Sequence, residues 1–123
     1  MILLNHLTIH VSSYLASRDW YVLNIGLRVE FENIESGVGG LEDSGAVELI
    51  LVQRPMPDRE RDCVLTFQCD SGHAKHAELS ARGISFVHEP KHVPWGYGAE
   101  LLDPDGYRVM IWDKHTMPGF KER

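Results

Sequence analysis

The clearest alternation of apolar and polar positions lies in residues 100–113, which read E-L-L-D-P-D-G-Y-R-V-M-I-W-D. Two apolar runs there flank Asp103-Pro104-Asp105-Gly106. Proline fixes φ at the value that the second turn position needs, and aspartate can form hydrogen bonds within the turn. Glycine tolerates the strained backbone conformation at the end of the turn. The segment therefore predicts a β-hairpin. Strand alternation after the turn separates two faces, with Arg108, Met110 and Trp112 on one and Tyr107, Val109 and Ile111 on the other.

The remaining pattern predicts an order of elements that occurs twice. The first half reads as strand 3–11, helix 14–24, strand 27–32, a glycine-rich connection at 37–40 and strand 46–52. The second half reads as strand 64–69, helix 72–82, strand 84–88, a loop at 89–96 and the closing hairpin. Helix N-caps are expected at Ser12-Ser13 and at Asp70 or Ser71, and the helices are expected to end at Gly26 and Gly83.

Short self-matches accompany this repeated order. An offset of 58 residues lays Leu7-Thr8-Ile9 on Leu65-Thr66-Phe67, and an offset of 62 lays the run starting at Val47 on the run starting at Val109. We therefore expect an α+β fold in which two tandem βαβββ modules, 1–53 and 62–115, form one domain with a linker at 54–61. Each helix would cover the outer face of a curved mixed sheet, and the other faces would line a cleft.

Composition and charge narrow the class of protein. The chain has 123 residues, 43% of them hydrophobic and 24% charged, as in an ordinary globular protein. The net charge of −6 is spread without a basic run, which excludes a nucleic-acid backbone as the expected partner. Met1–Leu4 is too short for a signal peptide or a membrane span, so a cytoplasmic protein without membrane contact is expected.

Two cysteines, Cys63 and Cys69, fall in or beside one predicted strand. Their separation along an extended chain is about 20 Å, well beyond the roughly 7 Å between Cα atoms that a disulfide allows. No C-x-x-C motif is present. Thiol redox chemistry and a structural zinc site are therefore not expected.

Four features together resemble the vicinal oxygen chelate superfamily. They are the duplicated order of elements, the start L-N-H-L-T-I-H-V, the pair Trp20-Tyr21 before Leu27, and the terminal D-P-D-G-Y. That superfamily contains glyoxalase I, extradiol dioxygenases, epimerases and bleomycin-resistance proteins. The resemblance covers essentially the whole chain and implies the cleft between curved sheets.

The resemblance also implies where a metal would be held. Metal-dependent members use one residue from the first strand and one from the last strand of each half. Carried over, these positions are His6 and Glu48 in the first half, and Val64 and Met110 in the second. Valine offers no donor and a thioether is a poor ligand for a hard cation. We therefore expect no resident cofactor or metal, with at most weak divalent binding at His6 and Glu48.

The bleomycin-resistance branch is accordingly the nearest match, and implies a homodimer that binds a small organic molecule such as a drug or an aromatic metabolite. The expected ligand-binding residues are His6, His10, Glu48, Ile50, Gln68, Trp95, Arg108, Met110 and Trp112. For Met110 alone, ordinary core packing is the stronger interpretation. Trp95 is included because family members close this loop over the cleft.

Two alternatives stay open. One is a glyoxalase-type lyase or isomerase, or a dioxygenase, with His6 and Glu48 as catalytic residues. Such an enzyme would use a loosely held metal, or Glu48 alone as a base beside a carbonyl. The other is a purely structural dimerisation module, whose cleft would be filled by its own side chains.

Overall fold

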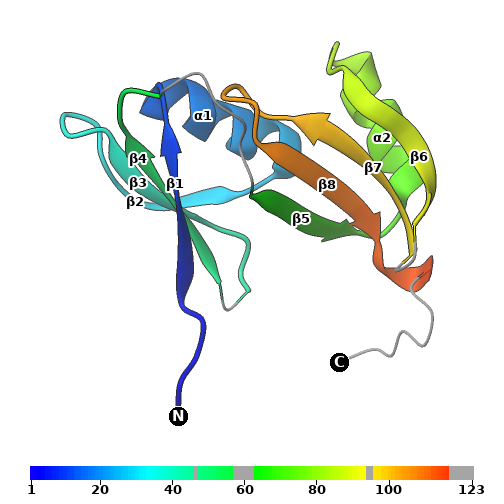
Figure 1. Ribbon diagram of the computed structural model, residues 1–123, viewed down its shortest axis with the longest axis horizontal. Helices are drawn as coiled ribbons and strands as arrows, with labels where there is room; N and C mark the ends of the chain where they lie inside the picture. Colours follow the sequence, from blue (N-terminus) through cyan, green and yellow to red (C-terminus); the bar gives the residue numbers. More distant parts are fainter. Residues whose placement is uncertain (46, 57–62, 94–95, 117–123) are drawn as a thin grey trace. The chain divides into compact units, whose positions relative to one another are not determined.

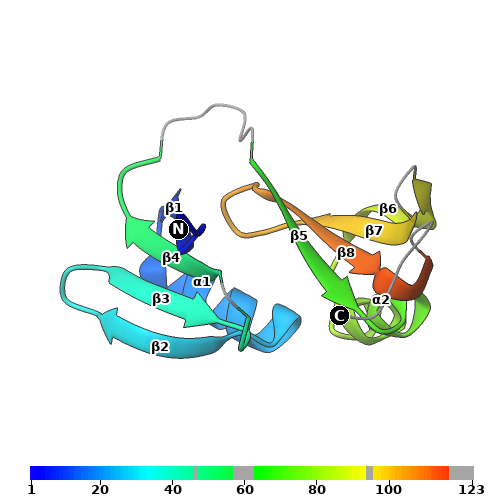
Figure 2. The same ribbon diagram turned by 90° about the horizontal axis from the view of Figure 1, so that it is seen from below.

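The computed structural model describes residues 1–45, 47–56, 63–93 and 96–116. The chain forms two compact units, Met1–Arg59 and Glu60–Arg123, each with one four-stranded mixed sheet (Figures 1 and 2). Both units have the expected β-α-β-β-β order, so the α+β fold of two βαβββ modules is confirmed. Most of the predicted linker, at 57–61, lies outside the described residues.

In the first unit, strand β1 (His6–Val11) leads to helix α1 (Tyr14–Trp20), a π-helical turn η1 (Tyr21–Ile25), and strands β2 (Arg28–Asn33), β3 (Val38–Glu42) and β4 (Glu48–Gln53). The sheet order is β1-β4-β3-β2, with β1 parallel to β4 and the other neighbours antiparallel. Ser13 caps α1 by accepting a hydrogen bond from Ala16 N at 3.2 Å. Gly26 ends the helical segment in the left-handed conformation, with φ of 91°.

The second unit repeats this topology with strand β5 (Val64–Cys69), helix α2 (Gly72–Ala81), strands β6 (Phe86–Val93), β7 (Gly96–Leu102) and β8 (Arg108–Asp113), and a final 3₁₀ turn η2 (Lys114–Thr116). Its sheet order is β5-β8-β7-β6, with β5 parallel to β8. Ser71 caps α2 through Ala74 N at 3.1 Å, and Gly83 follows the helix with φ of 82°. The two halves therefore begin and end their helices by the same means.

Each helix packs on one face of its own sheet, and the core of the unit lies between them (Figure 2). The buried apolar side chains include Ile9, Val11, Tyr14, Leu41, Leu49 and Leu51 in the first unit, and Leu65, Leu79, Leu101, Val109 and Ile111 in the second. Strand alternation places the intervening residues on the opposite face, which we call the open face. Candidate ligand-binding side chains lie on the open faces.

The predicted connection at 37–40 is wrong for residues 38–40, which are the first residues of strand β3. Two glycines in this strand explain why. A Cβ on Gly39 would collide with the Tyr14 ring and hydroxyl on the helix side of the sheet. A Cβ on Gly40 would collide with Glu48 and Phe31 on the open face. The glycine pair thus makes room for large side chains on both faces of one strand.

Tyr14 is fixed by two hydrogen bonds. Its hydroxyl donates to Glu32 Oε2 at 2.6 Å, and its backbone N–H donates to Gln53 Oε1 at 2.8 Å. Arg18 binds the same Glu32 carboxylate at 3.2 Å. Burial, and then the bond to Glu32, raises the pKa of Tyr14. The hydrogen bond from Tyr14, followed by that from Arg18, lowers the pKa of Glu32. A lowered carboxyl pKa stabilises the fold above the unfolded-state value, and this contribution is lost as the pH falls through the folded-state value.

The predicted hairpin turn is present. Buried Asp103 accepts hydrogen bonds through Oδ1 from the backbone N–H groups of Asp105 and Tyr107, both at 2.9 Å. Its carbonyl accepts from Gly106 N at 3.0 Å, and Gly106 adopts φ of 87°. Asp103 therefore stabilises the turn through hydrogen bonds within it, and Gly106 adopts the left-handed conformation at its end, as the sequence indicates.

Two predicted boundaries are wrong. The first helix does not continue to Asn24 as a regular α-helix, because it widens into η1 after Trp20. Strand β6 does not stop at His88 but runs to Val93, with register shifts between 86 and 88 and between 88 and 91. Bulges of this kind accommodate Pro90, which has no N–H to donate to a regular ladder. In the described part of the chain, no helix is long and apolar enough to cross a membrane.

Candidate ligand-binding pocket

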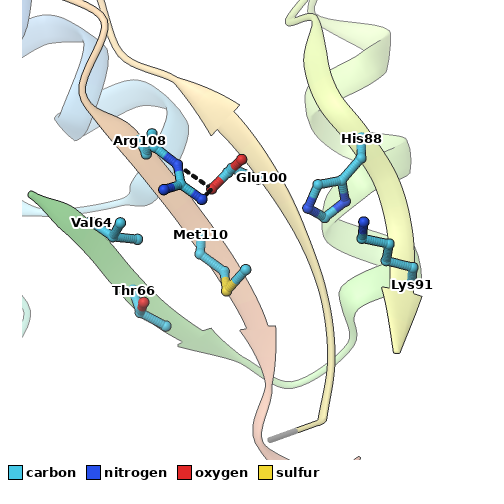
Figure 3. A pocket seen from close by; sticks show the side chains of 7 residues that line it. All are labelled: Val64, Thr66, His88, Lys91, Glu100, Arg108 and Met110. Carbon is cyan, nitrogen blue, oxygen red and sulfur yellow. Dashed lines mark hydrogen bonds and ion pairs between the residues drawn. The ribbon is translucent and has the colours of Figure 1, made fainter. Parts of the chain in front are cut away.

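The open face of the second unit contains a pocket of about 600 Å³ (Figure 3). The side chains that line it come from all four strands of the sheet: Val64, Thr66, His88, Lys91, Glu100, Arg108 and Met110. Register explains their meeting, because His88 pairs with Glu100, Glu100 with Met110, and Met110 with Thr66. The pocket volume lies within the range of about 300–1,000 Å³ that small-molecule sites occupy.

A charged pair crosses the pocket between β7 and β8. Arg108 donates to Glu100 Oε1 from both Nε, at 2.8 Å, and Nη2, at 2.7 Å. The Glu100 side chain is only 7% exposed, whereas that of Arg108 is 53% exposed. The arginine therefore neutralises a buried carboxylate while keeping part of its guanidinium in contact with solvent.

Strand β6 supplies the opposite side of the pocket. His88 and Lys91 both point from β6 toward the pocket, because the register shift between them puts them on the same face (Figure 3). His88 Nδ1 lies 2.8 Å from the Glu89 carbonyl oxygen. Since a carbonyl can only accept, Nδ1 is the donor in this contact, and in the neutral imidazole Nε2 is then an acceptor. Lys91 has no acidic partner in the part of the chain that the structure describes.

The predicted ligand-binding residues of the second unit fall in two neighbouring rows. Arg108 and Met110 line the pocket itself. Gln68 and Trp112 are paired with each other in the next row of the same face. Trp95 lies outside the described residues. The structure thus brings together four of the five residues predicted on this half.

The predicted residues of the first unit also share a face. His6 pairs with Glu48, Ile50 with Thr8, and His10 with Val52 across the parallel strands β1 and β4. His6 is exposed, and its Nδ1 lies 2.9 Å from Asn5 Oδ1. The two proposed catalytic residues, His6 and Glu48, are therefore direct cross-strand neighbours.

Two further carboxylates lie beside Glu48. Glu30 and Glu42 each place an oxygen so that all three carboxylates lie within 4.8 Å of one another. A register shift in β2 at Glu30 brings that residue toward the open face, and Arg28 binds Glu42 at 3.1 Å. This glutamate cluster makes the open face of the first unit acidic.

The strand register corrects the predicted equivalence between Glu48 and Met110. In the first unit His6 pairs with Glu48, and in the second Val64 pairs with Arg108. The last strands begin at 48 and 108, an offset of 60 residues instead of 62. The offset of 62 was wrong because it matched runs of apolar residues, which do not fix a register.

This register also tests whether the residues fit a metal held by both halves. The positions in the second unit are occupied by Val64, which has no donor, and Arg108, which is a cation. A guanidinium repels a divalent ion, so the second unit does not fit a four-residue metal site. Among the described residues, the group of donors placed close enough to share a metal ion is Glu30, Glu42 and Glu48 in the first unit, where His6 pairs with Glu48.

Glu100, His88 and Lys91 line the pocket without having been predicted as ligand-binding residues. A signal for Glu100 exists in the sequence, because residues 100 and 110 are nearly equally distant from the turn at 103–106 and so face each other in the hairpin. No comparable signal exists for His88 and Lys91, whose shared face depends on a bulge.

Comparison with known proteins supports the fold. The family model described as Glyoxalase/Bleomycin resistance protein/Dioxygenase superfamily matches residues 3–111. TnmS3, an antibiotic binding protein from Streptomyces sp. CB03234, is 23% identical, with a TM-score of 0.76 over 91% of this chain and 95% of that chain. A possible glyoxalase from Bacillus cereus is 17% identical, with a TM-score of 0.77 over 91% and 99% of the two chains.

A lactoylglutathione lyase from Agrobacterium tumefaciens is also similar, with 15% identity and a TM-score of 0.73 over 89% of this chain and 92% of that chain. No match is found among the curated proteins. At these identities the solved structures show a common fold, whereas the family model spans most of the sequence. The chain therefore belongs to the glyoxalase/bleomycin resistance protein/dioxygenase superfamily.

Proposed function

We propose that this protein binds a small organic molecule, such as a drug or an aromatic metabolite, in the pocket of the second unit. The observation that carries the proposal is the pocket itself, in which Val64 and Met110 provide apolar surface among converging polar groups. Binding sites for small organic ligands combine these two features. The similar structures include an antibiotic binding protein, which supports the same class of function.

Binding in this pocket requires no metal. Arg108 stands where the last strand would have to supply a ligand to the ion, and Glu100 already neutralises it. Apolar burial and hydrogen bonds to the polar lining can supply the affinity. A ligand that displaces poorly held water from Met110 and Val64 gains most of its binding free energy from that burial.

Thr66 is an exposed position from which the pocket can be filled without disturbing the core. Thr66→Trp places an indole there, and we expect the affinity for anthracene-2-carboxylate to fall at least tenfold, because the indole occupies the apolar surface beside Met110. Fluorescence anisotropy of the anthracene probe measures the dissociation constant.

The matched control is Thr8→Trp, which makes the same change at the corresponding exposed position of β1. It should leave the affinity within twofold of the unmodified protein. Equal loss of affinity in both variants, or no loss in Thr66→Trp, would contradict binding in the pocket of the second unit.

A metal-dependent lyase, isomerase or dioxygenase is the second candidate, and the glutamate cluster beside His6 and Glu48 is the observation that favours it. Carboxylate and imidazole donors suit a divalent ion such as Mn²⁺. Calorimetric titration of the protein with Mn²⁺ tests this candidate, with Glu48→Gln as the comparison. Tight binding that Glu48→Gln abolishes would raise this candidate above the first.

We also propose a homodimer in the cytoplasm. Apolar side chains that are exposed in the single chain, among them Leu7, Val29 and Phe31, would be covered by a second copy. The cytoplasmic location agrees with Cys63 and Cys69, which are both free. Burial raises the pKa of the Cys69 thiol, so this thiol stays protonated and unreactive. Light scattering that gives the mass of a single chain, 14.0 kDa, would exclude the dimer.

A further inference from the structure

We propose that the pocket of the second unit selects organic monoanions, with a carboxylate held between Lys91 and the outward side of Arg108. The apolar body of the ligand would lie over Val64 and Met110. This inference rests on the proposed function, because it specifies the chemistry of the ligand bound there. Three observations support it: the charges of the lining, its hydrogen bonds and the contrast between the two open faces.

The charges of the lining leave the pocket positive. Glu100 is neutralised by Arg108, whereas Lys91 has no acidic partner among the described residues. Two cations and one carboxylate give a net positive charge at the pocket, in a chain whose net charge is −6. The Lys91 side chain is exposed, so solvent partly screens its attraction for an anion, and added salt should weaken that attraction.

The guanidinium of Arg108 has unused donors. Both of its contacts, from Nε and Nη2, go to the same oxygen of Glu100. No contact of Nη1 is found within the described ranges, and just over half of the side chain is exposed. Because Glu100 fixes the orientation of the guanidinium, Arg108 loses less conformational freedom when it binds an anion. Glu100 is therefore a positioning residue for Arg108.

The apolar lining limits the kind of anion that the pocket holds. Inorganic phosphate could contact the two cations, but it has no apolar body to cover Val64 and Met110. A monoanionic carboxylate contacts the cations alone, while its apolar body covers Met110. The pocket thus favours an amphiphilic acid over a bare anion.

The open face of the first unit has the opposite charge. Glu48 occupies the place that corresponds to Arg108, and Glu30 and Glu42 lie beside it. An organic anion is repelled by that cluster, so the first unit excludes the ligand that the second attracts. The duplicated modules have therefore acquired different specificities at matching positions of the fold.

The experiment compares two probes with the same ring system, anthracene-2-carboxylate and anthracene-2-carboxamide, by fluorescence anisotropy. The carboxylate is expected to bind about tenfold more tightly, the usual difference for one hydrogen-bonded charge. Lys91→Met should remove most of this difference, whereas Lys91→Arg should keep it. Lys75→Met, which removes a lysine bound to Glu78 on α2, is the matched control and should change nothing. Inorganic phosphate at millimolar concentration should not displace the carboxylate.

The outcomes separate this inference from the proposed function. Equal affinities for the carboxylate and the amide would overturn the selection of anions and leave binding in the pocket intact. Displacement by inorganic phosphate would likewise overturn the preference for an amphiphilic acid. Binding of neither probe would overturn both the inference and the proposed function.

Discussion

Gly39→Ala is expected to lower the free energy of unfolding by about 3 kcal/mol, at the upper end for an overpacked core. The added methyl group would collide with the Tyr14 hydroxyl, and the nearest ring carbons would be 2.5 and 2.6 Å away. The Tyr14 side chain cannot move aside without breaking the hydrogen bond from its hydroxyl to Glu32. Urea denaturation followed by circular dichroism gives the difference in the free energy of unfolding.

A double-mutant cycle with Tyr14→Phe tests the cause. Tyr14→Phe removes the hydroxyl that the new methyl group would meet, and by itself should cost about 1 kcal/mol through the lost bond to Glu32. The double variant should be more stable than the sum of the two single effects predicts, because both changes act on the same contact. Strict additivity would show that the collision with the Tyr14 hydroxyl is not the source of the loss.

Arg108→Met is expected to cost about 2 kcal/mol at neutral pH, because it leaves the Glu100 carboxylate buried without its only partner in the described chain. The expected loss in the free energy of unfolding is smaller than for a fully buried ion pair, because Arg108 is half exposed. Chemical denaturation at pH 7 measures this loss.

Two controls accompany this variant. Arg82→Met breaks an exposed ion pair with Glu78 on α2 and should cost at most about 0.5 kcal/mol. The double variant Glu100→Met with Arg108→Met replaces the pair by apolar side chains and should recover most of the stability. A double variant as unstable as Arg108→Met would argue against an uncompensated carboxylate as the cause.

Much of the fold could be predicted because its signals are local. The turn at 103–106 has proline, aspartate and glycine where each is needed, and Ser13 and Ser71 precede helices that they cap. The order of elements repeats in both halves, so each half supports the interpretation of the other. Turns and helix caps depend on interactions between residues close together in the chain, so they can be predicted from a single sequence.

The site was less predictable because it depends on pairing between strands. The equivalence of Glu48 with Arg108 follows from the register of β1 with β4 and of β5 with β8, which an apolar self-match cannot fix. Lys91 joins the pocket only because β6 is bulged, in a segment that the sequence predicts as a loop. The glutamate cluster similarly depends on the register shift at Glu30.

The central claim is that an organic ligand occupies the open face of the second unit beside Met110. The direct measurement is the NMR signal of the Met110 ε-methyl group, assigned with Met110→Leu, during titration with anthracene-2-carboxylate. Binding beside Met110 should shift this signal upfield through the aromatic ring current, while the signals of exposed Met1 and of Met56 stay in place. A titration that shifts Met56 or Met1 and leaves Met110 unchanged would mean that the ligand binds elsewhere.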